Sequence, residues 1–255
     1  MAELIIKKGK MKIYGQLFMP SVHKKTYPLV ILCHGYTADH THSEIYAKDL
    51  NKIGVAAYAF DFCGGGPTSK SDGAMVEMSV LTEVQDVEAI LDYFRSREDF
   101  DSASIFLLGQ SQGGFVSALV GAQREEQIAG LILAYPAFVI PDDARKRFPE
   151  GMVIPKRVDQ FGCIIGKRYY EDVIGMDAYE EIAGFHKDVL IIHGDKDAIV
   201  PIDYSRRAKK VYDHATLMTI KGAGHGFDGA EARKAIEAAV RFVEAELSRK
   251  NKRER

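Results

Sequence analysis

The chain has 255 residues, 46% of them hydrophobic, so it is long enough to bury one substantial core. Its 34 Lys and Arg residues nearly balance its 36 Asp and Glu residues, so there is no basic excess of the kind that favours nucleic acid or anionic membrane surfaces. No apolar run approaches the roughly 18 residues of a membrane-spanning helix, and 3 cysteines at wide spacings indicate neither a disulfide framework nor a zinc site.

The N-terminal residues predict an antiparallel hairpin that leads the sheet. Residues 1–8 are typical of a short strand rather than of a signal peptide, and residues 11–18 alternate between apolar and polar side chains. Lys8-Gly9-Lys10 is the expected turn between them. With no leader expected and the cysteines free, a reducing, cytoplasmic setting fits best.

Short unbroken apolar runs then alternate with amphipathic helical stretches. A strand with one wet face would alternate in polarity, so continuous runs predict burial on both faces. The helical stretches at 80–95 and 228–248 repeat apolar residues at spacings of three and four. This order predicts a mostly parallel, doubly wound α/β sheet with right-handed crossovers. The apolar runs lie at residues 29–33, 55–60, 105–108, 131–134 and 189–192.

The alternation stops between residues 134 and 187, in a stretch rich in proline and aromatic residues with a charged cluster at 142–147. The stretch is too aromatic for a disordered linker and too irregular for one crossover helix, so we predict a cap inserted over the edge of the sheet. The expected organisation is a core of residues 1–135 and 186–248, a cap subdomain of residues 136–185, and a charged C-terminal tail at 249–255.

A candidate nucleophile, Ser111, lies in Gly109-Gln110-Ser111-Gln112-Gly113, between the strand at 104–108 and a helix expected at 115–124. A nucleophile elbow needs this strand, turn and helix, because its serine takes a strained backbone conformation. The flanking glycines Gly109 and Gly113 avoid Cβ clashes there. The alternative is a glycine-rich turn without chemistry.

Serine needs a base, and the base needs an orienting acid. His225 is the candidate base because it sits in a glycine-flanked loop before the last helix, and Asp197 is the candidate acid because it follows a buried strand. The order Ser, Asp, His along the chain is the order of α/β hydrolases. We expect Asp195 to tie the turn instead and His193 to be structural.

The oxyanion of an acyl-transfer intermediate needs positioned N–H donors. The backbone N–H of Gln112, at the start of a helix, is one candidate, and that of Tyr36, after Gly35, is the other. The Tyr36 ring is also a candidate lining of the acyl site. The alternative is a plain turn at His34-Gly35, in which Tyr36 neither donates to the oxyanion nor lines the acyl site.

Two other patterns favour structure over chemistry. His34, His40 and His42 lack the regular spacing and carboxylate partners of a metal site, so we expect no metal and solvated histidines. The glycine loop at 63–67 lacks the pattern of a nucleotide-binding loop, so no cofactor is expected. That loop is expected to pass close to the floor of the active site, anchored by Asp61-Phe62.

With these residues in place, the chain resembles bacterial α/β hydrolases, and more narrowly the cinnamoyl (feruloyl) esterase branch. The resemblance implies that Ser111, Asp197 and His225 form the triad and that Tyr36 and Gln112 supply the oxyanion donors. In that branch an insertion after the sixth strand grips the phenolic ring of the substrate, and residues 136–185 occupy that place here. The motifs that carry the resemblance are His34 to Tyr36, Ala59 to Phe62, Ser71 to Gly73, Met78 to Asp86, Gly109 to Gly114, His193 to Pro201 and Gly222 to Phe227.

The resemblance also implies candidate substrate contacts in the cap. A polar cap residue meets the ring hydroxyl in that branch, and Asp142 or Asp143 stands at about that place. The cap aromatics Phe138 and Tyr169 are candidates beside Tyr36.

The function expected from these residues is a serine carboxylic ester hydrolase that acts through an acyl-enzyme on hydroxycinnamate or other small aromatic esters. The alternatives are a short-chain aliphatic carboxylesterase or monoacylglycerol lipase and, more remotely, a non-catalytic hydrolase-fold protein that binds a ligand. The expected partner is a small-molecule ester, with neither nucleic acid nor a membrane, and the sequence leaves a homodimer open.

Overall fold

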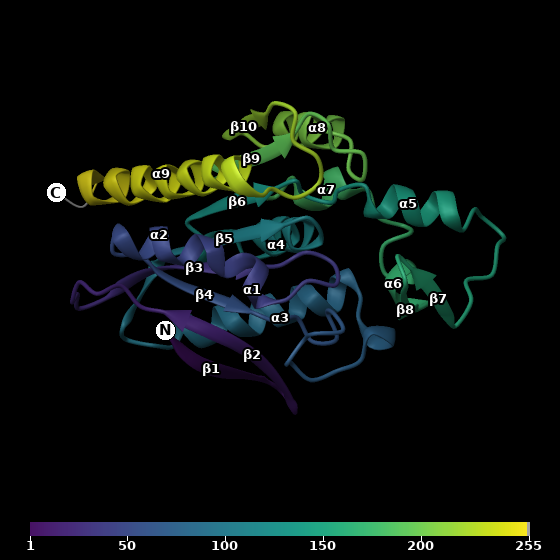
Figure 1. The fold of residues 1–255 in the computed structure, drawn as a ribbon, viewed down its shortest axis with the longest axis horizontal. Helices are drawn as coiled ribbons and strands as arrows, with labels where there is room; N and C mark the ends of the chain where they lie inside the picture. Colours follow the sequence, from purple (N-terminus) through teal and green to yellow (C-terminus); the bar gives the residue numbers. More distant parts are fainter. Residues whose placement is uncertain (254–255) are drawn as a thin grey trace.

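In the computed structural model, which describes residues 1–253, the chain forms a large sheet with the strand order β1-β2-β4-β3-β5-β6-β9-β10 (Figure 1). Strands β1 and β2 form an antiparallel hairpin, and β2 pairs antiparallel with β4. From β4 to β10 all neighbours are parallel. This confirms the predicted α/β-hydrolase fold, with a mostly parallel sheet led by a hairpin. The strands are Ala2–Lys8, Met11–Phe18, Tyr27–Cys33 (β3), Ala56–Phe60 (β4), Phe100–Gln110 (β5), Gly130–Ala134 (β6), Val189–Gly194 (β9) and Ala215–Ile220 (β10).

The central strands are apolar without a break because helices cover both faces of the sheet. Along β3, Leu29, Ile31 and Cys33 join the hydrophobic cluster that contains residues of α3 and α4. Val30 and Leu32 point the other way, into the cluster with residues of α2 and α9. The period-two alternation of a strand thus feeds two cores at once. The covering helices are α2 (Ala47–Lys52), α3 (Val80–Arg95), α4 (Gln112–Gln123) and α9 (Gly229–Arg253).

The insertion between β6 and β9 contains three helices and a small hairpin, and Figure 1 shows α5, α6, β7 and β8 at one end of the molecule. Its buried side chains, such as Phe148 and Tyr170, belong to the same cluster as Phe115 of α4, so this part shares the main core. The last helix of the insertion, α7, packs against α4 and against α8, which follows β9. The elements are α5 (Ile140–Arg147), β7 (Arg157–Gln160), β8 (Cys163–Gly166), α6 (Arg168–Glu171) and α7 (Ala178–Ile182), followed by α8 (Asp203–Val211) after β9.

The C-terminal helix is longer than predicted and takes in most of the expected tail. Helix α9 runs from Gly229 to Arg253, and the expected tail residues 254–255 lie outside the described part of the chain. Arg249 forms an ion pair with Asp188, just before β9, at 3.0 Å, and Lys250 forms one with Asp101 of β5 at 2.7 Å, so the end of the helix contacts the main body of the protein. Within residues 1–253, no helix combines the length and apolarity needed to cross a membrane.

Candidate active site

Ser111 lies at a sharp turn between β5 and α4, with φ 52° and ψ −119°. Positive φ is strained for a residue with a side chain, and the surrounding contacts hold it there. A Cβ on Gly109 would lie 2.2 Å from the Gly113 carbonyl oxygen, and one on Gly113 would lie 2.3 Å from the carbonyl oxygen of His34. The chain therefore needs glycine at both positions, and the turn has the strained geometry that the sequence predicted.

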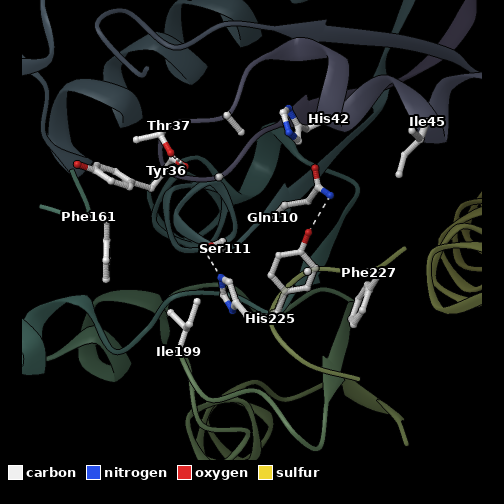
Figure 2. A pocket seen from close by; sticks show the side chains of 14 residues that line it. Tyr36, Thr37, His42, Ile45, Gln110, Ser111, Phe161, Ile199, His225 and Phe227 are labelled. Atoms are coloured by element: carbon white, nitrogen blue, oxygen red, sulfur yellow. Dashed lines mark hydrogen bonds between the residues drawn. The ribbon is translucent and has the colours of Figure 1, made fainter. Parts of the chain in front are cut away.

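The serine, histidine and aspartate expected from the sequence come together in one hydrogen-bonded chain. The Oγ atom of Ser111 lies 2.9 Å from Nε2 of His225, and Nδ1 of that histidine lies 2.7 Å from Oδ2 of Asp197 (Figure 2). Because a carboxylate only accepts, the proton sits on Nδ1, which leaves Nε2 to accept from the serine hydroxyl.

Besides His225, three other groups within residues 1–253 donate hydrogen bonds to the Asp197 carboxylate. Its Oδ1 accepts from the backbone N–H groups of Ile199 at 2.9 Å and Val200 at 2.8 Å. Its Oδ2 also lies 3.1 Å from Nε2 of His193, which is fully buried. That Nε2 lies 2.9 Å from the Val200 carbonyl oxygen as well, so it carries the proton, and Nδ1 accepts from Ser205 Oγ at 2.7 Å. Burial lowers the pKa of His193, in keeping with a neutral, structural residue.

Asp195 lies elsewhere, as expected. Its Oδ1 accepts from the backbone N–H of Gly222 at 2.6 Å. This bond ties the loop after β9 to the loop that carries His225.

The two expected oxyanion donors flank the serine. The 34–37 loop touches the elbow, since a Cβ on Gly35 would lie 3.1 Å from Cβ of Ser111. Within residues 1–253, the backbone N–H groups of Tyr36 and Gln112 have no protein acceptor. Uncommitted N–H groups beside a nucleophile can bind a developing negative charge.

Two cavities meet at Ser111. One has a volume of about 600 Å³ and is lined by His225, Phe227 and Ile45, and the other has about 70 Å³ and is lined by Gln112 and cap residues. Figure 2 shows Phe161 and Ile199 on one side of Ser111, with Ile45 and Phe227 on the other. The residues that line both cavities are Tyr36, Ser111, Phe161 and Ile199.

The structure places some of the expected substrate contacts at these cavities. Tyr36 lines both, and Tyr169 and Asp143 line the narrow one. The Asp143 carboxyl forms no hydrogen bond or ion pair with any residue in the range 1–253, and burial is the main cause that raises its pKa.

Two expected contacts lie away from the site. Asp142 forms an ion pair with Arg145 at 2.5 Å and accepts from the Tyr204 hydroxyl at 2.7 Å, and it lines neither cavity. Phe138 is 1% exposed and packs against Phe115 and Tyr179 in the core. Of the predicted pair Asp142 or Asp143, only Asp143 therefore lines a cavity, and neighbouring residues direct the Asp142 and Phe138 side chains elsewhere.

Sequence reasoning missed Phe161 and Ile199 at the mouth of the site. Both are apolar and well exposed, at 77% and 56%. Phe161 is at the tip of the β7–β8 hairpin with φ 52°, and no local pattern marks this position.

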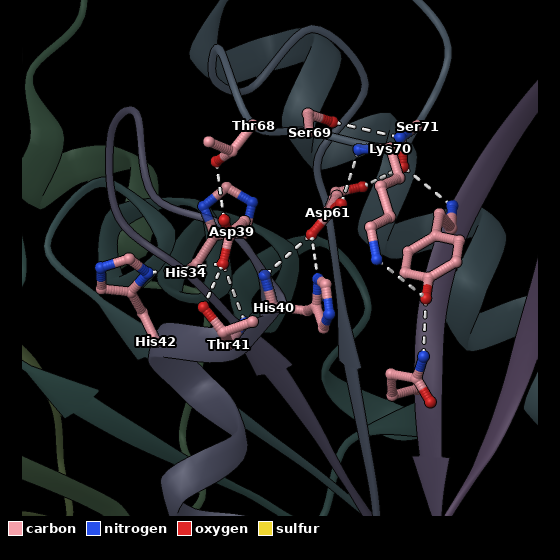
Figure 3. Close-up of polar contacts among 12 residues, drawn as sticks. His34, Asp39, His40, Thr41, His42, Asp61, Thr68, Ser69, Lys70 and Ser71 are labelled. Atoms are coloured by element: carbon pink, nitrogen blue, oxygen red, sulfur yellow. Dashed lines mark hydrogen bonds and ion pairs between the residues drawn. The ribbon is translucent and has the colours of Figure 1, made fainter.

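The histidines after β3 are not all solvated, contrary to expectation. His34 is fully buried, where its Nδ1 bonds to the Gly35 carbonyl at 2.8 Å and its Nε2 accepts from the Phe62 N–H at 3.0 Å. Desolvation lowers the pKa of His34 to about 4. His40 is buried beside Asp61, with 2.7 Å between Nδ1 and Oδ1 (Figure 3). Only His42 is exposed, and within residues 1–253 no group of His, Cys, Asp and Glu could hold a metal ion.

The Asp61 carboxylate binds the chain on either side of the glycine loop at 63–67 rather than the loop itself, which was the expected partner. It accepts from the backbone N–H groups of His40 at 2.8 Å and Lys70 at 2.7 Å. The backbone N–H of Thr37 in turn donates to the Gly65 carbonyl at 3.2 Å. The glycine loop therefore supports the loop that presents Tyr36.

Comparison with known proteins agrees with this geometry. The structure of Est1E from Butyrivibrio proteoclasticus with ferulic acid bound is 29% identical, covers 96% of this chain and 99% of that one, and superposes with a TM-score of 0.87. Caffeoylshikimate esterase of Arabidopsis thaliana is 31% identical over 52% of this chain and 40% of its own length. Monoacylglycerol lipase of Mycolicibacterium smegmatis is 24% identical over 78% of this chain and 79% of its own length.

The sequence profile of the Hydrolase_4 family, described as "Serine aminopeptidase, S33", matches residues 24–158, more than half of the 255 residues. The resemblance to esterases of the cinnamoyl branch is confirmed at the level of family and fold. The chain belongs to the Hydrolase_4 family of α/β hydrolases and is an enzyme of the esterase and lipase type.

Proposed function

We propose that the protein is a serine carboxylic ester hydrolase that acts through an acyl-enzyme on esters of hydroxycinnamic or other small aromatic acids. The observation that carries the proposal is the chain from Ser111 through His225 to Asp197, with 2.9 and 2.7 Å between its atoms, beside two uncommitted N–H groups.

In the proposed reaction, Ser111 Oγ attacks the ester carbonyl carbon while Nε2 of His225 takes the hydroxyl proton. The carbonyl oxygen becomes an oxyanion between the N–H groups of Tyr36 and Gln112. The C–O bond to the alcohol then breaks, and the alkoxide takes the proton from His225. Water attacks the acyl-enzyme by the same steps in reverse, releasing the acid and restoring the serine.

The side of Ser111 on which the alcohol leaves indicates which cavity takes the alcohol and which takes the acyl group. Because His225 must protonate the leaving oxygen, the alcohol lies on its side of Ser111, in the open cavity of about 600 Å³. The acyl group then enters the narrow cavity beside Gln112, where the rings of Tyr169 and Tyr170 form part of the wall. A narrow aromatic slot favours a flat acyl group.

The unpartnered Asp143 carboxyl in this slot supports recognition of a hydroxyl on the acyl group. A phenolic O–H can donate to it, whereas a plain alkyl chain offers it no donor. The likeness to Est1E, whose structure holds ferulic acid, points to the same class of acid.

A second candidate is a carboxylesterase or monoacylglycerol lipase that acts on aliphatic esters. Exposed apolar side chains at the mouth of the open cavity, Ile45, Phe161 and Ile199, favour it. So does the likeness to the mycobacterial monoacylglycerol lipase.

Two measurements test these proposals. A fluorophosphonate probe should label the wild-type protein and leave the folded Ser111→Ala variant unlabelled. A non-catalytic ligand-binding protein would not be labelled. The values of kcat/KM for methyl ferulate, p-nitrophenyl butyrate and a monoacylglycerol then decide the substrate class, and equal or higher values for the aliphatic esters would refute the aromatic preference.

A further inference from the structure

The segment from Met78 to Asp86 stands out in the sequence, yet the reaction above does not use it. It leads into α3 and forms its first two turns, and Glu83 on this helix is only 1% exposed. Its Oε2 accepts a hydrogen bond of 2.8 Å from Nε2 of Gln112, the residue after the nucleophile. Burial is the main cause that raises the pKa of Glu83 well above the ordinary range for glutamate. A buried acid is thus bonded to one of the two residues that flank the oxyanion site.

The side chain of Gln112 is fully committed and itself 1% exposed. Its Nε2 also donates to Met78 Sδ at 3.7 Å, and its Oε1 accepts from the Tyr169 hydroxyl at 2.6 Å. The amide therefore has no spare group for a substrate. These bonds fix the position of the residue after Ser111, whose backbone N–H has no protein acceptor within residues 1–253.

Tyr169 connects this arrangement to the cap. It belongs to α6, is 5% exposed, and its ring lies edge-on to Tyr36 with 5.9 Å between ring centroids. One cap side chain therefore contacts both residues whose N–H groups flank Ser111. A second bond, of 2.5 Å from Ser79 Oγ to Asp172 Oδ2, fastens the end of α6 to the start of α3.

We propose that Glu83, Gln112 and Tyr169 form a positioning relay through which the seated cap fixes the oxyanion donors. The proposal rests on the hydrolase function proposed above. Electrostatic stabilisation depends on donors held at the place where charge develops, and removing one donor costs roughly a hundredfold to a thousandfold in rate. A relay that only positions a donor should have a smaller effect. The proton of the Tyr169 hydroxyl is committed to Gln112, so this hydroxyl cannot also donate to the substrate.

The test uses two measurements. The first is kcat and KM for p-nitrophenyl acetate, whose acyl group is too short to fill the narrow cavity. The second is the rate of phosphonylation of Ser111 by a fluorophosphonate. Tyr169→Phe and Glu83→Leu should each lower kcat and the phosphonylation rate by about five- to twentyfold, with KM within about twofold. Glu83→Gln keeps an oxygen that accepts from Gln112 and should retain at least about half of kcat. In the double variant the losses should be smaller than the product of the single losses, because both act through one amide.

A matched control is Tyr58→Phe, which removes another buried tyrosine hydroxyl, bonded to the Leu4 carbonyl at 3.0 Å, in a residue that lines neither cavity. It should lower the unfolding temperature without changing kcat. Folded Tyr169→Phe and Glu83→Leu variants that react at the wild-type rate would overturn the relay, as would Glu83→Gln being as impaired as Glu83→Leu.

The proposed function fails separately. A wild-type protein that is phosphonylated but cleaves no ester would overturn the ester-hydrolase proposal, and the phosphonylation rates of the variants would still decide the relay. A folded wild-type protein that does not react with the probe would overturn both.

Discussion

Replacing Asp197 by asparagine tests how the base is oriented. In the wild type, Oδ1 accepts from the Ile199 and Val200 N–H groups at 2.9 and 2.8 Å, and Oδ2 faces Nδ1 of His225 at 2.7 Å and Nε2 of His193 at 3.1 Å. Each oxygen therefore faces two donors. An amide has only one acceptor oxygen, so its NH2 group must face donors in either orientation.

The two orientations of the amide differ in whether the groups that face its NH2 can become acceptors. Backbone N–H groups cannot move their protons, whereas an imidazole can change its tautomer, so the NH2 group should face the histidines. His225 then carries its proton on Nε2, which lies 2.9 Å from Ser111 Oγ and can no longer accept from it. We expect kcat to fall by about 10⁴-fold, or about 5.5 kcal/mol in the barrier. The donor left facing the amide at His193 should cost about 1–3 kcal/mol of stability.

The assay is kcat for p-nitrophenyl butyrate, with thermal unfolding to confirm that the variant is folded. Asp195→Asn is the matched control, because an amide oxygen can still accept from the Gly222 N–H that Asp195 binds at 2.6 Å. It should retain kcat within about threefold, since it keeps that hydrogen bond. A folded Asp197→Asn variant with kcat within tenfold of wild type, or a larger loss in Asp195→Asn, would refute this account of the base.

Three further predictions concern the acyl slot, the buried histidine and the elbow. Asp143→Asn should lower the ratio of kcat/KM for methyl ferulate to kcat/KM for methyl cinnamate, which lacks ring hydroxyls, by about three- to tenfold. Asp142→Asn should leave this ratio unchanged. Equal effects of the two variants would contradict the role of Asp143 in binding the ring hydroxyl. The pKa of His34 is lowered to about 4 in the folded state, against an ordinary value of 6.5, so between these two pH values unfolding takes up a proton. The contribution of neutral His34 to folding stability is therefore complete above pH 6.5 and is lost as the pH falls toward 4. Urea unfolding should show about 2 kcal/mol less stability at pH 5 than at pH 7 from this group, and the loss should shrink by that amount in His34→Gln. Gly113→Ala places a Cβ at 2.3 Å from a backbone carbonyl oxygen and should destabilise the fold by about 2–4 kcal/mol, measured as a lower unfolding temperature; an unchanged temperature would show that the elbow can relax.

The sequence by itself determined the fold class and the arrangement around Ser111. Unbroken apolar runs are a local consequence of burial on both faces, as β3 shows with residues in both cores. The glycines at 109 and 113 are local too, because the strained turn that needs them is made by adjacent residues. Parallel strands end at one edge of the sheet, so chain order alone predicted that loops bearing Asp197 and His225 would meet there.

Only the tertiary structure decided which side chains of the insertion face the site. Asp142 and Asp143 are neighbours on α5, but successive helical residues point about 100° apart, so one bonds to Tyr204 and the other lines the cavity. Phe138 and Phe161 look alike in the sequence, yet one is 1% exposed in the core and the other 77% exposed at the mouth of the site.

The contacts of Glu83 with Gln112, and of Gln112 with Tyr169, join residues far apart in the chain. No periodicity encodes such contacts, because they depend on how α3, α4 and α6 pack together. The sequence thus determined the chemistry that a strand, a turn and a helix can carry, while the packing of the cap on the elbow decided what surrounds it.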